Sequence, residues 1–220
     1  MINVEKIEVD VASCGHITNC YLLYNENRNG ILIDPGYDEN KIIEYVNKFN
    51  VKVEYIVITH AHGDHMGALE AVQKYTNSKI IVHKNDYNAL LSKEENYNEM
   101  LGVKNQYLNE DDIITVYDGY LIEIDELKFE IIHTPGHTSG CICIYEINNN
   151  MLFTGDTIFS DSYGRCDLFS GDFDKMVESL KKLFERFDDV KIHPGHGEVV
   201  NIKIAKRYIR MLMAMKGIQI

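Results

Sequence analysis

The pattern of apolar and polar positions divides the first half of the chain into expected strands and helices. Apolar–polar alternation and short apolar runs are both typical of β-strands, and they occur at residues 1–9, 20–24, 30–34, 53–59 and 79–83. Apolar residues recur at helical spacing at 40–49 and 68–75. From residue 30 onward, the expected strands therefore alternate with helices.

The second half begins with a polar stretch and then returns to strands. Residues 85–108 are rich in Asn and Glu with weak helical periodicity, whereas 113–147 contains several strand-like runs. Asn148–Asn150 is a candidate hairpin turn. The remaining elements are an amphipathic helix at 172–187, a short strand at 190–193, and a last helix from a cap at Asn201 to about Lys216. This order predicts two layers of sheet flanked by helices.

Length and organisation indicate one domain. A chain of 220 residues suits one substantial domain, and it contains no internal repeat or long Gly/Ser/Pro linker. We therefore expect a single domain over 1–220. The Met and Ile residues of the last helix could form a seam between copies in a homo-oligomer, but packing of that helix face on the sheet is the favoured interpretation.

Charge and cysteine usage narrow the class of protein. The net charge of −12 argues against nucleic acid or an anionic membrane as partner, since both require basic patches. The sequence has no basic leader followed by an apolar run and no membrane-length apolar segment, so we expect a cytoplasmic location. The sequence has five cysteines, which form no CxxC pair and are predicted to be free thiols: Cys14, Cys20, Cys141, Cys143 and Cys166. A redox or ligand role for Cys166 is a less favoured alternative.

Candidate metal ligands follow four of the expected strands. Residues 60–65, which read His-Ala-His-Gly-Asp-His, hold three His and one Asp directly after an apolar run. Three shorter motifs also follow apolar runs, namely 133–138, 154–157 and 193–197. Each short motif alone is weak, because a single His or Asp at a strand end is usually a hydrogen-bonded loop residue. Together the four motifs supply seven candidate ligands: His60, His62, Asp64, His65, His137, Asp156 and His196.

These motifs resemble those of the metallo-β-lactamase fold superfamily, in order and over nearly the whole chain. The resemblance implies an α/β fold, an αββα four-layer sandwich of two mixed sheets flanked by helices, with the site at one edge of the sheets. It also implies the metal assignment: one ion on His60, His62 and His137, another on Asp64, His65 and His196, and Asp156 as the bridge.

The chemistry of the ligands agrees with this assignment. Imidazoles and carboxylates suit Zn²⁺ best, with Fe²⁺ or Mn²⁺ as alternatives. Two such ions about 3.5–4 Å apart can share a hydroxide, because each lowers the pKa of bound water from about 15.7 towards roughly 7. Two divalent ions, two carboxylates (Asp64 and Asp156) and one hydroxide sum to about +1 in a protein of net charge −12. The site should therefore attract an anionic or carbonyl-bearing substrate.

Within the superfamily, the chain looks most like the short, single-domain members of the glyoxalase II-like branch. The stretch 162–168 looks like the G-R-x-D segment of that branch, which implies a substrate-binding role for Tyr163 and Arg165. The Arg165 guanidinium could bind a substrate carboxylate through two hydrogen bonds, or it could pair with Asp167 and stiffen the loop. Only about 24 residues follow His196, where full-length glyoxalase II enzymes carry a helical domain with glutathione contacts. We therefore leave the thiol of the substrate open.

The resemblance implies hydrolysis of a small thioester, or of a related ester or lactone. A metal-bridged hydroxide would attack the carbonyl carbon, and Asp64 would orient that hydroxide. The alternative is an oxidoreductase similar to the persulfide dioxygenases, with one iron on His60, His137 and Asp156. A metal-stabilised binding module is a third hypothesis. It predicts a metal whose coordination is closed to water, and the open, bridged site implied by the resemblance argues against it.

Four histidines lie outside the ligand set. His133 and His193 each precede a Pro-Gly turn and could orient the ligands, although ordinary core or loop histidines are the favoured interpretation. His16 and His83 have no sequence context that points to a function.

Overall fold

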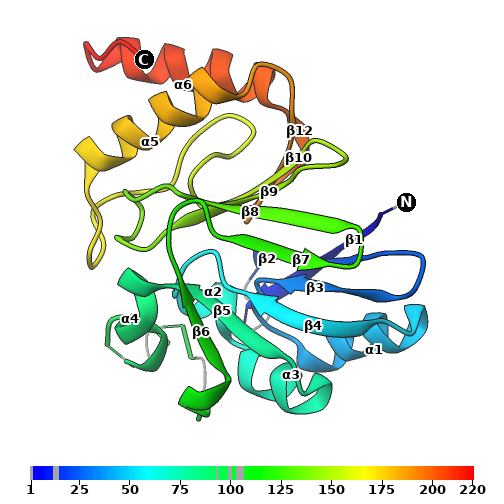
Figure 1. Cartoon of the computed structure of the whole chain (residues 1–220). Helices are drawn as coiled ribbons and strands as arrows, with labels where there is room; N and C mark the ends of the chain where they lie inside the picture. Colours follow the sequence, from blue (N-terminus) through cyan, green and yellow to red (C-terminus); the bar gives the residue numbers. More distant parts are fainter. Residues whose placement is uncertain (1, 12–14, 93, 99–100, 103–106) are drawn as a thin grey trace.

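Two six-stranded sheets face each other in the computed structural model, with helices on their outer faces (Figure 1). The structure describes residues 2–11, 15–92, 94–98, 101–102 and 107–220, so Cys14 lies outside the described residues. The first sheet follows the order of the chain: β1 (Asn3–Val11), β2 (His16–Tyr24), β3 (Asn29–Ile33), β4 (Lys52–Val57), β5 (Lys79–His83) and β6 (Ile113–Val116). The second sheet runs in the reverse order: β12 (Val200–Asn201), β11 (Lys191–Pro194), β10 (Met151–Gly155), β9 (Ile142–Glu146), β8 (Leu127–His133) and β7 (Leu121–Ile124).

Both sheets are mixed. In the first sheet β1, β2 and β3 pair antiparallel, and the pairs from β3 to β6 are parallel. In the second sheet only β10 and β11 pair parallel. The expected hairpin turn at 148–150 does join the antiparallel strands β9 and β10. The predicted fold class, with two mixed sheets between helices, is therefore confirmed.

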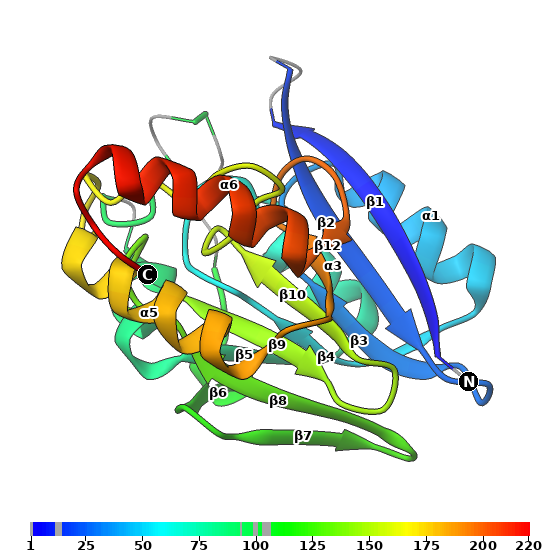
Figure 2. The same ribbon diagram turned by 90° about the horizontal axis from the view of Figure 1, so that it is seen from above.

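The helices complete the outer layers. The helices α1 (Glu39–Phe49) and α3 (Leu69–Thr76) cover the first sheet, and α5 (Phe173–Arg186) and α6 (Ile202–Met215) lie side by side over the second (Figure 2). The short helical segments are α2 (Gly63–Met66), η1 (Lys84–Asp86), α4 (Tyr87–Leu91) and η2 (Glu110–Asp112). The pattern did not predict the single turn of α2 or the two-residue strand β12. No helix within the described ranges is both long and apolar enough to cross a membrane.

The alternation of side chains along a strand explains how one short apolar run can contribute residues both to the core between the sheets and to a core beneath the outer helices. Successive side chains of a strand point to opposite faces of its sheet. In β2, Leu22 therefore packs towards α1 and α3, whereas Leu23 enters the core between the sheets. In β8, Ile131 joins that same central core and Ile132 packs towards α5 and α6. Strands buried on both faces read as continuous apolar runs, as the sequence shows.

The last helix uses one apolar face for the expected packing. Asn201 caps it, since its side chain accepts a hydrogen bond from the backbone N–H of Lys203 at 3.0 Å. The inner face is buried in the core of the second sheet: Ile202, Ala205, Ile209 and Met213. A second apolar stripe is exposed: Ile204, Tyr208, Met211 and Met215. Homo-oligomerisation through this stripe stays a prediction.

The cysteines within the described residues are free thiols, as expected. Cys166 is half-buried and its thiol donates to the carbonyl of Gly164 at 3.3 Å. Burial raises its pKa to about 11, so the group stays protonated at neutral pH. A protonated thiol is a poor metal ligand and a poor nucleophile, which disfavours the redox or ligand role considered for Cys166.

Candidate metal centre

The candidate ligands gather at one edge of the sandwich because they follow strands that end there. His60 follows β4, Asp156 follows β10 and His196 follows β11. Each of these strands pairs parallel with a neighbour in its sheet, and the carboxyl ends of parallel strands meet at one edge, where α/β proteins place their sites. The loop after β8 brings in His137 from the second sheet. The structure thus brings all seven predicted residues together, and we call them the centre.

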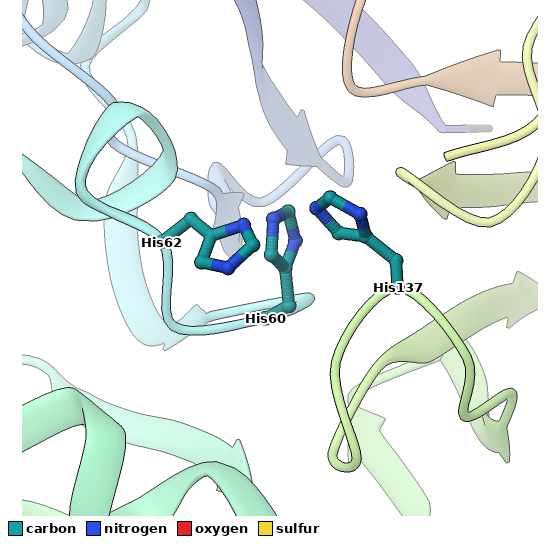
Figure 3. Close-up of side chains that lie close together, drawn as sticks. All are labelled: His60, His62 and His137. Carbon is teal, nitrogen blue, oxygen red and sulfur yellow. The ribbon is translucent and has the colours of Figure 1, made fainter. Parts of the chain in front are cut away.

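The first cluster of the centre consists of His60, His62 and His137 (Figure 3). Their ligand atoms all lie within 4.8 Å of one another, and all three side chains are buried. Their Nε2 atoms have no hydrogen-bond partner among the described residues. Buried polar atoms are normally hydrogen-bonded, so three converging ring nitrogens without a hydrogen-bond partner indicate a position for a bound cation.

Protonation favours metal binding at the first cluster. Burial lowers the pKa of His60 well below its ordinary value, and burial with the neighbouring His137 lowers that of His62 to about 3. Both rings are therefore neutral at pH 7, the form that binds metals. The Nδ1 of His137 donates to the backbone carbonyl of Arg165 at 2.6 Å, which leaves the lone pair on Nε2.

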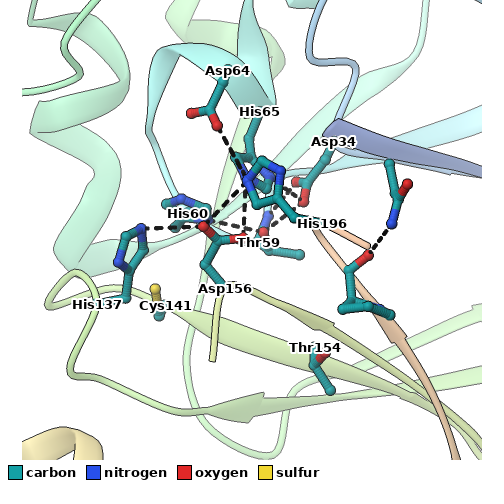
Figure 4. Close-up of polar contacts among 12 residues, drawn as sticks. Asp34, Thr59, His60, Asp64, His65, His137, Cys141, Thr154, Asp156 and His196 are labelled. Atoms are coloured by element: carbon teal, nitrogen blue, oxygen red, sulfur yellow. Dashed lines mark hydrogen bonds and ion pairs between the residues drawn. The ribbon is translucent and has the colours of Figure 1, made fainter. Parts of the chain in front are cut away.

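The second cluster consists of Asp64, His65 and His196 (Figure 4). The carboxylate atom Oδ2 of Asp64 lies 3.3 Å from Nε2 of His196 and 3.7 Å from Nε2 of His65. The Nδ1 of His196 donates to the carbonyl of Ile17 at 2.6 Å, so its Nε2 faces the centre. Asp64 and His65 come from α2, the one helical turn that follows the first two histidine ligands.

Asp156 lies between the two clusters. Its Oδ1 is 3.3 Å from Nε2 of His65, and its Oδ2 is 3.5 Å from Nε2 of both His137 and His196 (Figure 4). Burial opposes ionisation, yet the imidazoles of His196 and His65 hold the pKa of Asp156 well below its usual range. An ionised carboxylate therefore lies between the two clusters, and its role as a bridge between two metal ions stays a prediction.

In the second cluster the imidazoles of His65 and His196 form ion pairs with the carboxylates of Asp64 and Asp156. Burial disfavours a charged His196, but the carboxylates of Asp156 and Asp64 raise its pKa to about 10. A cation would displace that proton, because metal ligands must be deprotonated. The imidazoles and carboxylates of the centre, together with the unpaired atoms of the first cluster, make it able to bind metal ions.

Two buried carboxylates that the sequence analysis did not single out support the ligand loops. Asp34 accepts hydrogen bonds from Nδ1 of His65 at 2.9 Å and from the backbone N–H of Thr59 at 2.8 Å. Asp86 accepts from the N–H of Ala61 at 3.1 Å and from the hydroxyl of Thr138 at 2.7 Å. Asp86 therefore connects the loop of His60 and His62 to the loop of His137. In the sequence, Asp34 looks only like the start of an Asp-Pro-Gly turn.

A third residue missed by the sequence analysis is His16, the first residue of β2. Its Nε2 lies 3.0 Å from Oδ2 of Asp64, and its ring centroid is 4.9 Å from that of His196. It is a polar residue at a strand end, but it stands alone in the sequence. No local pattern connects it with a motif 48 residues away.

The predicted substrate-binding residues face other partners in this structure. The guanidinium of Arg165 makes two hydrogen bonds to the carboxylate of Asp167, at 2.7 and 2.8 Å, and both side chains are exposed. The loop-stiffening alternative is thus the arrangement observed. Tyr163 packs against the core beneath α5 and α6, with its ring 6.2 Å from that of Phe173. A role for either residue in substrate binding stays a prediction.

The histidines of the two Pro-Gly motifs do not orient the ligands by hydrogen bonds. His133 donates from Nε2 to the carbonyl of Ser139 at 2.9 Å. His193 stacks on Phe153 at 4.6 Å between ring centroids, and its ring nitrogens have no partner among the described residues. Both residues belong to strands, β8 and β11, so alternation rather than the following turn sets their direction.

The buried imidazole of His193 predicts acid sensitivity. Burial lowers its pKa from an ordinary 6.5 to about 4. The pKa of His193 is lower in the folded protein than in the unfolded chain, so protonation favours the unfolded chain. The free energy of unfolding is therefore highest above pH 6.5 and falls as the pH decreases towards 4. The loss through this one group is about 3 kcal/mol of unfolding free energy. Urea unfolding of the metal-free protein between pH 7 and 4 should show a shallower decline for His193→Phe. Parallel declines would contradict the prediction.

Comparisons with known proteins agree with the fold and indicate the family. The model of the metallo-beta-lactamase superfamily matches residues 15–196. The hydroxyacylglutathione hydrolase GloC of Haemophilus influenzae is 30% identical over 207 residues, which cover 94% of this chain and 96% of that protein. A probable metallo-hydrolase of Methanocaldococcus jannaschii is 35% identical over 193 residues, 84% of this chain and 90% of that one.

A solved structure gives the same result for the backbone. The crystal structure of BLEG-1, a B3 metallo-beta-lactamase, matches with a TM-score of 0.86 at 26% identity and covers 96% of this chain and 99% of its own. The match extends over nearly the full length of both chains, and so includes both sheets and the edge that carries the centre. On its sequence, its fold and its cluster of His and Asp ligands, the chain belongs to the metallo-β-lactamase superfamily.

Proposed function

We propose that this chain is a binuclear metal-dependent hydrolase that cleaves a small thioester, or a related ester or lactone. The observation that carries the proposal is the position of Asp156, whose two carboxylate oxygens face ligands of both clusters. One carboxylate placed between two sets of imidazoles would suit a pair of cations better than a single cation.

The residues of the chain divide the work. Bound ions would supply Lewis acidity for the carbonyl and a water whose pKa falls from about 15.7 towards roughly 7. The neutral rings of His60 and His62, together with His137, would hold one ion, and Asp64, His65 and His196 the other. Asp64 stays ionised because the neighbouring imidazoles keep its pKa well below the usual range despite burial. An ionised Asp64 can accept a hydrogen bond from the attacking water and orient it.

The choice of a thioester is supported by relatives and by charge. GloC of Haemophilus influenzae, which its name describes as a hydroxyacylglutathione hydrolase, aligns with almost the full length of this chain. Zinc is the favoured metal because its preferred ligands are those of the centre, with iron or manganese as the alternatives. A centre of charge near +1 in a protein of net charge −12 would attract anionic acyl substrates.

The alternative is a mononuclear iron oxidoreductase that uses His60, His137 and Asp156. These residues do lie in the centre, and Asp156 is 3.5 Å from Nε2 of His137. A single 2-His-1-carboxylate site would, however, leave His62 and the whole second cluster without a ligand role. This unused set of imidazoles favours the hydrolase.

Metal analysis combined with a substrate panel tests the proposal. We expect two metal ions per chain and release of free thiol from at least one acyl thioester. Treatment with a chelator should abolish turnover, and added Zn²⁺ should restore it. Two bound ions without turnover of any thioester, ester or lactone would refute the hydrolase. One iron per chain with consumption of oxygen would support the oxidoreductase instead.

A further inference from the structure

We propose that His16 is an additional ligand of the second metal position and closes that position on its solvent side. The inference rests on the two-metal centre of the proposed function, although it does not depend on which bond is hydrolysed. It adds a fourth residue, from the start of β2, to the second cluster of Asp64, His65 and His196.

Geometry places the His16 imidazole where a ligand would lie. The ligand atoms of His16, Asp64 and His196 all lie within 4.8 Å of one another. Oδ2 of Asp64 is 3.0 Å from Nε2 of His16 and 3.3 Å from Nε2 of His196. Two neighbouring donors at about 2.0–2.1 Å from one Zn²⁺, at angles between roughly 90° and 110°, are separated by roughly 2.8–3.4 Å. Both observed distances are close to that spacing.

The backbone of β2 holds His16 and His196 in register. Ile17, the next residue after His16, accepts the hydrogen bond from Nδ1 of His196 at 2.6 Å. The pairing of His16 with Val11 on β1 fixes the start of the strand. One strand end therefore orients His196 through its backbone and delivers the His16 side chain to the same carboxylate. The two rings are tilted by 52° with centroids 4.9 Å apart, so they approach from different directions.

The side chain of His16 is more exposed than that of any residue of the centre, the most exposed of which is His196 at 22%. Half of its side-chain surface is accessible, whereas the side chain of His65 is fully buried and that of Asp64 is 11% exposed. The first cluster has three imidazoles, but the second has only two without His16. A third imidazole on the open side would make the second ion harder to remove and would shield it from chelators in solution.

The matched variants are His16→Gln and His133→Gln. Both replace an imidazole by an amide, and His133 lies outside the ligand clusters, where it donates to the carbonyl of Ser139. After dialysis against a graded chelator series, His16→Gln should lose one of its two metal ions at a chelator concentration at least tenfold lower than wild type. The other ion should be retained as in wild type, and His133→Gln should match wild type throughout. Identical chelator curves for wild type and His16→Gln would overturn the proposal.

A crystal structure of the zinc-loaded protein separates ligation from a mere hydrogen bond to Asp64. We expect Nε2 of His16 at about 2.0–2.1 Å from an ion. A separation above about 3 Å between Nε2 of His16 and the ion, with His16 still hydrogen-bonded only to Asp64, would also overturn the proposal.

The failure of this inference and the failure of the proposed function give different results. Loss of the second ion in His16→Gln from a protein that hydrolyses no acyl substrate would contradict the proposed function and leave this inference intact. Turnover with unchanged metal retention in His16→Gln would do the reverse.

Discussion

Replacement of Asp156 by Asn is expected to leave no more than one metal ion bound and to reduce hydrolysis by roughly 10³-fold. Outer residues that only support a ligand typically contribute 10–100-fold, and Asp156 should exceed them because its oxygens face His137 of the first cluster and His65 of the second. Asn keeps the shape but removes the negative charge that offsets two cations. Metal content and thioester turnover of the purified variant measure the two effects.

The control for Asp156→Asn is Asp167→Asn. Asp167 is an exposed carboxylate on a neighbouring loop, and it pairs with Arg165 rather than with the centre. That variant should keep two ions and should lose activity only to the extent that the Arg165–Asp167 pair shapes the loop. Two ions and near wild-type turnover in Asp156→Asn would exclude a bridging role for Asp156.

The gathering of the candidate ligands at one edge could be predicted from the sequence because each follows a strand that the apolar pattern identifies. His60 comes shortly after β4, and Asp156 directly follows β10. Once those runs are read as buried strands, their ends must emerge at an edge, and His and Asp at several such ends have one common explanation. The fold class was predictable for a related reason, since strands buried on both faces are apolar throughout.

The supporting residues could not be predicted because their partners are distant in the sequence. Asp86 contacts Ala61 and Thr138, which lie 25 and 52 positions away. His16 meets Asp64 across 48 positions, through strand pairing that no local pattern reveals. In the sequence, a buried Asp in a loop cannot be distinguished from an exposed one. Its role becomes clear only when the backbone N–H groups that donate hydrogen bonds to it are known. Such contacts form only when the two sheets pack together. The apolar–polar periodicity of a single sequence predicts strands and helices but not contacts between distant loops.

The Pro-Gly motifs show how a repeated pattern can mislead. In both 133–138 and 193–197 a His precedes Pro-Gly by one or two residues and another His follows it. The following His, which is His137 or His196, lies after the turn and faces the centre. The preceding His is still part of its strand, and its neighbours are rings or carbonyl groups outside the ligand set. The turn, rather than the histidine pair, is the shared functional feature.

That turn leads to a second prediction with a large effect, at Gly195. A Cβ at this position would lie 2.5 Å from Oδ1 of Asp156 and 2.6 Å from Cε1 of His65. His65 cannot easily move, since it is fully buried and its Nδ1 is hydrogen-bonded to Asp34. Gly195→Ala should therefore displace the Asp156 carboxylate and reduce turnover by about 100-fold, the effect expected of a shift near 1 Å in a reacting group.

Gly197→Ala supplies the matched control for Gly195→Ala, two residues along the same loop. Gly197 has a φ of +78°, and a Cβ added there would meet no atom within 4 Å, so alanine brings backbone strain but touches no ligand. Strain of that kind costs about 1–2 kcal/mol of stability. We expect Gly197→Ala to melt at a lower temperature with its metal content and turnover per folded molecule unchanged. We expect Gly195→Ala to lose metal and turnover even where it remains folded. Equal losses in the two variants would mean that loop strain, rather than the contact of Gly195 with Asp156 and His65, governs the centre.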